Sequence, residues 1–108
     1  MKFQFNNESF SFEALRVAGY ACYGGADLGE VLVTCRGIGE GDEVAWHSRW
    51  KALAARLEEL GRAALRSGHR VSAREALLRA SGYNRAAEFY LRDDPTHDPE
   101  VASLRRRP

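Results

Sequence analysis

The chain has 108 residues, of which 44% are hydrophobic, and its formal net charge is +1. This length is typical of one domain, so residues 1–108 are expected to form a single unit around one core. A charge this close to zero argues against a protein that uses a strong electrostatic field to bind nucleic acid or an acidic membrane.

The chain begins with a short alternating segment and a helical pattern. Residues 2–6 alternate apolar and polar side chains, which predicts a short strand or an extended arm. A helix is predicted from Phe10 to Cys22, because apolar residues recur there at spacings of three and four in two stripes. A helix that is apolar on two sides is usually buried on two sides. Gly24 and Gly25 are expected to end it, since glycine takes the left-handed C-cap conformation readily. One stripe contains Phe12, Leu15, Gly19 and Cys22, and the other contains Phe10, Ala14, Val17 and Ala21.

A second helix is predicted between Asp27 and Arg36. The Asp27 carboxylate is placed to accept a hydrogen bond from a free amide of the first turn, and Glu30 is placed to reach back as in a capping box. Residues 37–41 are rich in glycine and are predicted to be a linker. They are not expected to bind phosphate, because they lack the Gly-x-Gly-x-x-Gly spacing and carry Glu40.

The clearest pattern predicts a central antiparallel hairpin of two helices, over about 43–66 and 73–91. Asp42 is expected to cap the first, and a capping box of Ser72 and Glu75 the second. Each helix carries apolar residues spaced three and four apart, and because a short turn joins the helices, their seams are expected to pack together. The seams are Trp46, Trp50, Leu53, Leu57, Leu60 and Ala64, and Ala73, Ala76, Ala80, Tyr83, Ala87 and Tyr90.

Two further features concern the second hairpin helix and the C-terminal residues. Gly82 lies inside the second hairpin helix and is expected to mark a bend. Asp98-Pro99-Glu100 has the composition of a helix start, yet only residues 101–107 stand between it and Pro108. This pattern fits either a helix that continues in a longer ancestor or a short terminal helix docked on the hairpin. The predicted fold is therefore all-α, a bundle of four to five helices.

The chain has no complete catalytic or metal site. An α/β-hydrolase nucleophile needs Gly-x-Ser-x-Gly, and no serine here has glycine two positions before or after it. None of the three histidines has another histidine at the spacing of metal ligands, so no metal or other cofactor is predicted. His69 follows Gly68 and is instead predicted to cap a helix C-terminus.

Compartment is predicted from the cysteines and the apolar runs. Cys22 and Cys35 have neither zinc nor redox spacing and are expected to be reduced, partly buried thiols. No secretory apolar region follows Met1, and no stretch approaches the roughly 18–20 apolar residues that span a bilayer. These features predict a cytoplasmic location without membrane contact.

The aromatic residues support two interpretations. The first, which we favour, is a closed hairpin core. The second is that one end of the seam opens onto a pocket for a small apolar or aromatic ligand, since tryptophan and tyrosine supply apolar walls with a polar tip. Candidate pocket residues are Tyr20, Tyr23, Trp46, Trp50, Tyr83, Phe89 and Tyr90.

Four runs also carry a family resemblance: YGGADLGEVL at 23–32, WxxxWxxLAxRLE at 46–58, GHRVSAREALLRAS at 68–81 and YxRAAEFYL at 83–91. In this order they resemble the N-terminal helical region of a family of α/β-hydrolases that includes fermentation-respiration switch-like esterases and dihydroxypseudooxynicotine hydrolase. In that family the region covers the active site and shapes the substrate pocket, whereas the Ser-Asp-His triad and oxyanion hole belong to the later hydrolase domain. The resemblance therefore implies a lid without a triad, whose partner is an α/β-hydrolase domain on a separate chain or in a missing continuation.

The sequence leaves two alternatives to the lid function open. Residues 57–80 also resemble one tetratricopeptide unit, although solenoids need about three repeats. A stand-alone binding or scaffold protein derived from such a hairpin would expose apolar surface and is expected to form a homo-oligomer. The other alternative is a small non-hydrolytic enzyme that uses the aromatic cavity.

Overall fold

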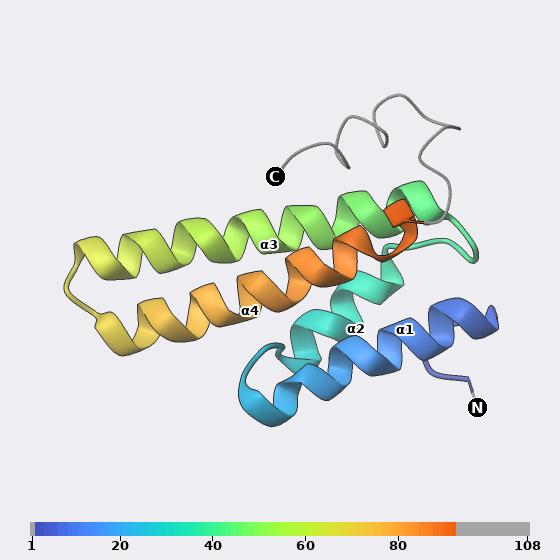
Figure 1. Ribbon diagram of the computed structural model, residues 1–108, viewed down its shortest axis with the longest axis horizontal. Helices are drawn as coiled ribbons and strands as arrows, with labels where there is room; N and C mark the ends of the chain where they lie inside the picture. Colours follow the sequence, from blue (N-terminus) through green and yellow to red (C-terminus); the bar gives the residue numbers. More distant parts are fainter. Residues whose placement is uncertain (1, 93–108) are drawn as a thin grey trace.

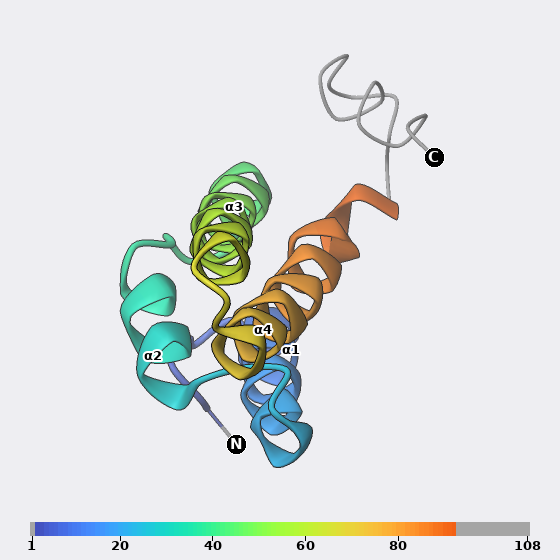
Figure 2. The ribbon, with the colours of Figure 1, turned by 90° about the vertical axis from the view of Figure 1, so that its left-hand side faces the viewer.

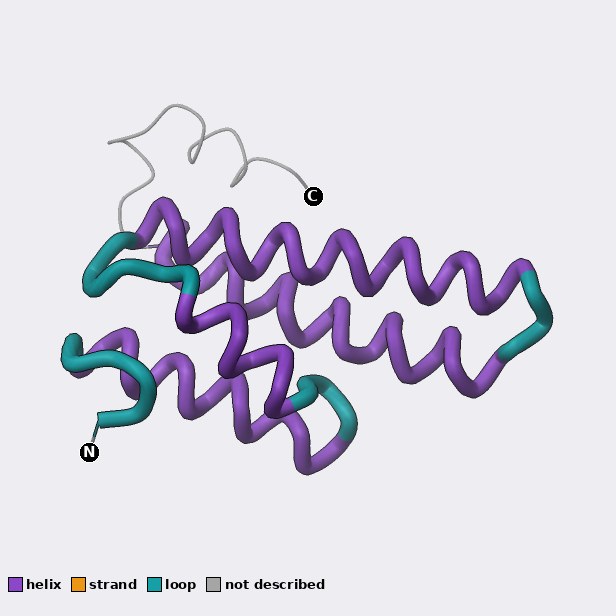
Figure 3. Tube along the Cα trace, turned by 180° about the vertical axis from the view of Figure 1, so that it is seen from behind, coloured by secondary structure: helices purple, strands orange, loops and turns teal. Residues whose placement is uncertain are grey.

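The computed structural model describes residues 2–92, and the helix predicted to begin at Asp98 lies outside them. The described residues form four α-helices and two short 3-10 helices, with no strand among them (Figure 3). This confirms the predicted all-α fold class. The elements in chain order are α1 (Glu8–Gly19), η1 (Tyr20–Tyr23), α2 (Leu28–Arg36), α3 (Glu43–Arg66), α4 (Arg70–Glu88) and η2 (Phe89–Arg92).

Helices α3 and α4 form the predicted antiparallel hairpin (Figure 1). Asp42 caps α3 by accepting a hydrogen bond from the Ala45 amide at 2.9 Å. At the turn, Gly68 has a φ of +79°, and the backbone amide of His69 donates to the Ala64 carbonyl at 2.8 Å. The bounds of α3 agree with the prediction.

Helix α4 begins earlier than its sequence indicates. Its first helical residue is Arg70 and its N-cap is His69, so Ser72 lies inside the first turn. No side chain caps this end of α4, and the predicted capping box of Ser72 and Glu75 is wrong. The physical reason is the tight turn at Gly68, after which the chain enters α4 directly. Ser72 therefore has a helical backbone, whereas an N-cap needs an extended one.

Both seams lie in the hairpin core, with one shift near the turn. The four seam residues of α3 from Trp46 to Leu57 are buried, but Leu60 is 55% exposed. Gly61 is buried in its place, against Leu77 of α4. A seam that alternates spacings of four and three has a period of about 3.5 residues, whereas a straight helix has about 3.6. The buried face therefore drifts by about 20° per heptad relative to the seam, in the direction that brings Gly61 toward α4. The seam of α4 is buried throughout.

Helices α1 and α2 pack on one side of the hairpin, near the end away from the α3–α4 turn (Figure 1). Viewed along the hairpin, α2 lies beside α3, and α1 beside α4 (Figure 2). The Phe10 ring anchors α1, with its centroid 5.0 Å from the ring centroids of both Trp46 and Tyr90. No helix within residues 2–92 combines the length and apolar character that crossing a bilayer requires.

The N-terminal segment is a loop, so of the two alternatives for residues 2–6 the strand is wrong. The Glu40 carboxylate accepts hydrogen bonds from the backbone amides of Asn6 and Asn7, both at 2.9 Å, and these bonds lower the pKa of Glu40. Asn7 then caps α1 by accepting from the Phe10 amide at 3.0 Å. The helix therefore begins at Glu8 rather than at the predicted Phe10.

Helix α1 is buried on one side only, which corrects the expectation of two buried stripes. Phe10, Ala14 and Val17 are buried, whereas Phe12 is 65% and Leu15 37% exposed. Gly19 and Cys22 are also exposed. We call Phe12, Leu15 and Gly19 the outer stripe of α1, whereas Cys22 lies in η1. Both cysteines are free thiols, but only Cys35 is buried, so the expectation of a partly buried Cys22 is wrong.

The first helical segment ends at Gly24 as predicted, but α1 itself ends at Gly19 and the last turn is the 3-10 helix η1, and the loop that follows fits closely against α4. Gly24 has a φ of +84°, as a left-handed C-cap requires. A Cβ on Gly82 would lie 2.1 Å from the Gly25 carbonyl oxygen, so this loop and α4 approach each other more closely than any side chain allows. Gly82, where a bend is predicted, therefore has a packing role.

Candidate functional site

Four of the predicted pocket residues lie together in one buried aromatic cluster. The ring centroid of Trp46 is 5.6 Å from that of Trp50 and 5.4 Å from that of Tyr90, and Trp50 stacks on Tyr83 at 5.8 Å. All four are buried. The Trp46 indole donates to the Ala86 carbonyl at 2.8 Å. This cluster is the centre of the hairpin core.

The other three predicted residues lie at one edge of this cluster, by the end of α1. Arg85 lies over the Tyr20 ring at 5.1 Å and donates from Nη2 to the Tyr23 hydroxyl at 3.0 Å. The Phe89 ring is 4.8 Å from that of Tyr90. The structure therefore separates the predicted set into a closed core and a small surface group, and their contact with a ligand stays a prediction.

A cleft of about 110 Å³ opens beside this surface group, between α1 and α4. We call it the Glu13 cleft. Water occupies roughly 30 Å³ per molecule and whole-ligand sites are about 300–1,000 Å³, so the Glu13 cleft has room for only part of a ligand. It is lined by Glu13, Arg16, Val17, Tyr20, Trp46, Arg85, Ala86 and Phe89.

Glu13 is the unusual residue of this cleft, because it is a carboxylate that is only 7% exposed. Burial raises its pKa, and the Arg16 guanidinium, 3.8 Å away, partly opposes that change. Sequence reasoning missed Glu13, although a signal was present. Phe10, Ala14 and Val17 define a buried face at positions i, i+4 and i+7, and Glu13 occupies the i+3 position of that face.

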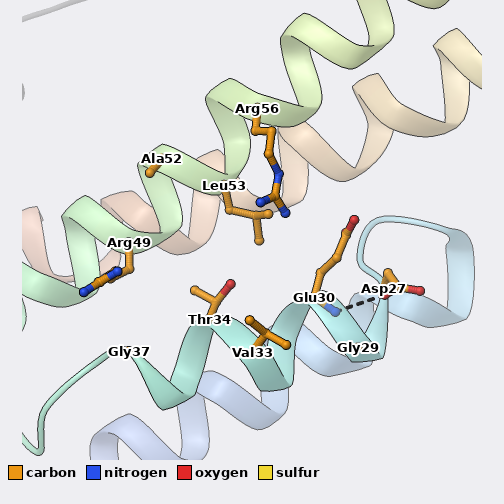
Figure 4. A pocket seen from close by; sticks show the side chains of 10 residues that line it. All are labelled: Asp27, Gly29, Glu30, Val33, Thr34, Gly37, Arg49, Ala52, Leu53 and Arg56. Atoms are coloured by element: carbon orange, nitrogen blue, oxygen red, sulfur yellow. Dashed lines mark hydrogen bonds between the residues drawn. The ribbon is translucent and has the colours of Figure 1, made fainter.

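A larger groove of about 710 Å³ runs between α2 and α3 (Figure 4). We call it the α2/α3 groove. Val33 and Leu53 supply apolar contact from the two helices, and Arg49 and Arg56 extend from α3 (Figure 4). No sequence motif indicates this groove, because it forms between helices whose facing residues are set by tertiary packing. Its lining is Asp27, Gly29, Glu30, Val33, Thr34, Gly37, Arg49, Ala52, Leu53 and Arg56.

One end of the α2/α3 groove is tied to α4 by a hydrogen-bond network. Asp27 caps α2 as predicted, accepting from the Glu30 amide at 3.0 Å. The Glu30 side chain does not complete a capping box, which corrects that prediction. It accepts instead from the Tyr83 hydroxyl at 2.6 Å and from Arg79 Nε at 3.0 Å, while the Asp27 amide donates to Tyr83 at 2.8 Å. Burial, together with the bond to Glu30, raises the pKa of Tyr83.

The histidines of the described chain have structural positions. His47 Nδ1 donates to the Ala87 carbonyl at 3.0 Å, which links α3 to α4. His69 joins the two hairpin helices. Within residues 2–92, no three His, Cys, Asp or Glu side chains lie close enough together to hold a metal ion.

Comparison with known proteins shows that most of this chain is similar to one segment of larger hydrolases. It is 40% identical over 99 residues to the hydrolase ORFZ of Pyricularia oryzae, covering 92% of this chain and 23% of that protein. It is 44% identical over 91 residues to the hydrolyase poxO of Penicillium oxalicum, covering 84% and 22%. It is 36% identical over 102 residues to the α/β hydrolase xenA of Xenoacremonium sinensis, covering 90% and 24%.

The chain thus spans less than a quarter of the length of these relatives. No family model matches it. No solved structure matches it significantly. What the comparisons establish is similarity to a segment of proteins that are named hydrolases and α/β-hydrolases.

Proposed function

We propose that this chain is the helical cap of an α/β-hydrolase, which covers the active site and shapes the substrate pocket without a catalytic triad of its own. Similarity to a segment of proteins named α/β-hydrolase supports this proposal. The described residues contain helices and no strand, so the sheet that the α/β class requires would come from the larger remaining part of such an enzyme.

The observation that carries the proposal is the outer stripe of α1. Phe12 and Leu15 lie three residues apart on one helix face and are both exposed, although α1 has a well-buried opposite face. Burying a side chain of this size contributes about 1.5–3 kcal/mol. We propose that the outer stripe packs on the hydrolase domain. The Glu13 cleft beside it, with Tyr20 and Phe89, would then form part of the pocket wall.

A chimera tests this function. In the hydrolyase poxO, the segment that matches this chain is replaced by this chain, and hydrolysis of a panel of p-nitrophenyl esters is measured. The expected result is turnover by intact poxO and by the chimera, and none by poxO from which the segment is deleted. A folded chimera that hydrolyses none of the esters cleaved by intact poxO would contradict the proposal.

The role of the outer stripe is tested in trans, with this chain added to the deleted poxO. Phe12→Ser is expected to weaken association by about 10–100-fold, which is the loss of one buried aromatic side chain. Val44→Ser is the matched control, because Val44 is also exposed but lies on α3, outside the outer stripe. Equal weakening by both substitutions would show that the interface is elsewhere.

A second candidate function is a stand-alone homo-oligomer, and the same stripe favours it. When no hydrolase domain is present, Phe12 and Leu15 remain available to another copy of the chain. Sedimentation is expected to show a dimer or higher oligomer that Phe12→Ser returns to a monomer. A wild-type monomer at high concentration would count against this function.

A further inference from the structure

The α2/α3 groove carries two arginines held on the same helix face. Arg49 and Arg56 are seven residues apart on α3, which places their Cα atoms about 10.5 Å apart along the helix axis. The Arg49 guanidinium lies close to Gly37, the C-cap of α2, since a Cβ on Gly37 would be 3.3 Å from the Arg49 Cζ and Nε atoms. Arg56 reaches toward the α2 side of the groove (Figure 4). Arg49 therefore lies at the Gly37 end of the groove and Arg56 at the Glu30 end.

Neither arginine has an acidic partner within residues 2–92. The other arginines of α3 do, since Arg62 pairs with Glu58 at 3.5 Å and Arg66 with Glu59 at 3.2 Å. Within α3, the positions one turn away from Arg49 carry no carboxylate, and the one carboxylate a turn away from Arg56, Glu59, pairs with Arg66 instead.

The acidic residues that line the groove are engaged elsewhere. The Glu30 carboxylate is bound by Arg79 and Tyr83 of α4, and the Asp27 carboxylate caps the first turn of α2. Neither carboxylate forms an ion pair with Arg49 or Arg56, so both guanidinium groups are left without a direct anionic partner in the groove. Val33, which is 66% exposed, supplies apolar surface between them, beside the edge of the buried Leu53.

We propose that the α2/α3 groove binds an acidic amphipathic helix from a partner polypeptide. Two carboxylates at positions i and i+7 of such a helix have the same axial Cα spacing as Arg49 and Arg56, and an apolar residue between them would meet the exposed Val33. A small ligand with one carboxylate would reach only one of the two arginines. This proposal goes beyond the cap function, because it holds whether or not the partner is a hydrolase.

The probe is a fluorescein-labelled 15-residue helical peptide with glutamates at i and i+7 and leucines on the same face. Its matched control has glutamine at those two positions. Fluorescence anisotropy is expected to show tighter binding of the glutamate peptide at low salt, with the difference shrinking as the salt concentration rises. Arg49→Gln and Arg56→Gln are each expected to weaken binding by about 2–5-fold, the range for partly exposed ion pairs.

Arg74→Gln is the matched control variant, since Arg74 is an exposed arginine of α4 with no ion pair in the described chain. It removes the same charge outside the groove and is expected to leave binding unchanged. An equal effect of Arg74→Gln, or equal binding of the glutamine peptide, would overturn the proposal. Circular dichroism of each variant verifies that the helices remain folded, so a loss of binding is assigned to the groove.

Two further measurements exclude other occupants. Pimelate, a free dicarboxylate, should not displace the peptide at equimolar concentration, and displacement would indicate a small-molecule site. The chain also has its own acidic residues after position 92, at Asp93, Asp94, Asp98 and Glu100. A variant with amides at these positions should bind the peptide no more tightly than the wild type, and a gain would mean that this segment is the occupant. These assays contain no hydrolase domain. A negative result would therefore contradict the groove proposal and leave the cap proposal unaffected.

Discussion

Replacing Gly82 by alanine measures how closely α4 packs on the loop between η1 and α2. The new Cβ would lie 2.1 Å from the Gly25 carbonyl oxygen and 3.3 Å from Cδ2 of Tyr20, whereas real Cβ atoms essentially never approach other heavy atoms to less than 3.0 Å. The loop or the helix must therefore move by about 1 Å in a closely packed interior. The atom in the way belongs to the backbone, so no side-chain rotation relieves the contact.

The expected magnitude is the balance of two opposing terms. Alanine is favoured over glycine in a helix interior by about 1 kcal/mol. Overpacking costs about 1–3 kcal/mol, and moving the loop also strains the 2.8 Å hydrogen bond from the Asp27 amide to Tyr83, which contributes about 1 kcal/mol. We expect Gly82→Ala to lower the free energy of unfolding by about 1–3 kcal/mol, a loss of roughly 4–8 °C in Tm for each kcal/mol.

Two other glycines provide controls for the assay, which is urea unfolding followed by circular dichroism. A Cβ on Gly19 would meet nothing within 4 Å, so Gly19→Ala should stabilise the chain by up to about 1 kcal/mol. A Cβ on Gly61 would meet only the flexible Leu77 side chain below 3.0 Å, so Gly61→Ala should be close to neutral. The reasoning is refuted if Gly82→Ala is as stable as Gly19→Ala.

Three further predictions concern buried polar groups. Tyr83→Phe removes a hydroxyl that makes two hydrogen bonds, and urea unfolding should show a loss of about 1–3 kcal/mol. Burial raises the pKa of Cys35 to about 11 from an ordinary 9.0, so Ellman's reagent at pH 8 should modify the exposed Cys22 quickly and Cys35 only after unfolding; equal rates would contradict this. Because the Cys35 thiol ionises at a lower pH in the unfolded chain than in the folded one, the free energy of unfolding should fall as the pH rises from 9 to 11. Burial also raises the pKa of Glu13, which means that the buried carboxylate costs stability when it is charged. Glu13→Gln should therefore raise the free energy of unfolding at pH 7 and have less effect at pH 4, and a larger gain at pH 4 would contradict this.

Local bonding explains why most helix ends are predictable from the sequence. Asp27 and Asp42 each accept a bond from an amide three residues later, and Gly24 and Gly68 each adopt a positive φ. These events involve neighbouring residues, so sequence spacing is sufficient to predict them. The starts of α1 and α4 are exceptions. Helix α1 begins two residues before the predicted Phe10, and the hairpin turn starts α4 at Arg70, before the predicted N-cap Ser72.

The candidate site is less predictable, because its parts come from separate helices. The aromatic residues of the hairpin are evident from their spacing, and their burial in one cluster follows from pairing the two seams. Arg49 and Arg56 carry no motif. They become notable only when α2 lies beside α3 and its groove-lining carboxylates, Asp27 and Glu30, bind other partners.

The sequence by itself determined the helical class, the hairpin and its seams, since periodicity and capping depend on residues within about one turn of each other. The tertiary structure alone decided which stripe of α1 is buried, because both stripes are apolar and only the position of the hairpin distinguishes them. It also decided that Glu30 binds Tyr83 and Arg79 rather than its own helix end, and that Gly82 admits no side chain. These contacts join residues about 50 positions apart in the sequence, and helical periodicity carries no information over that range.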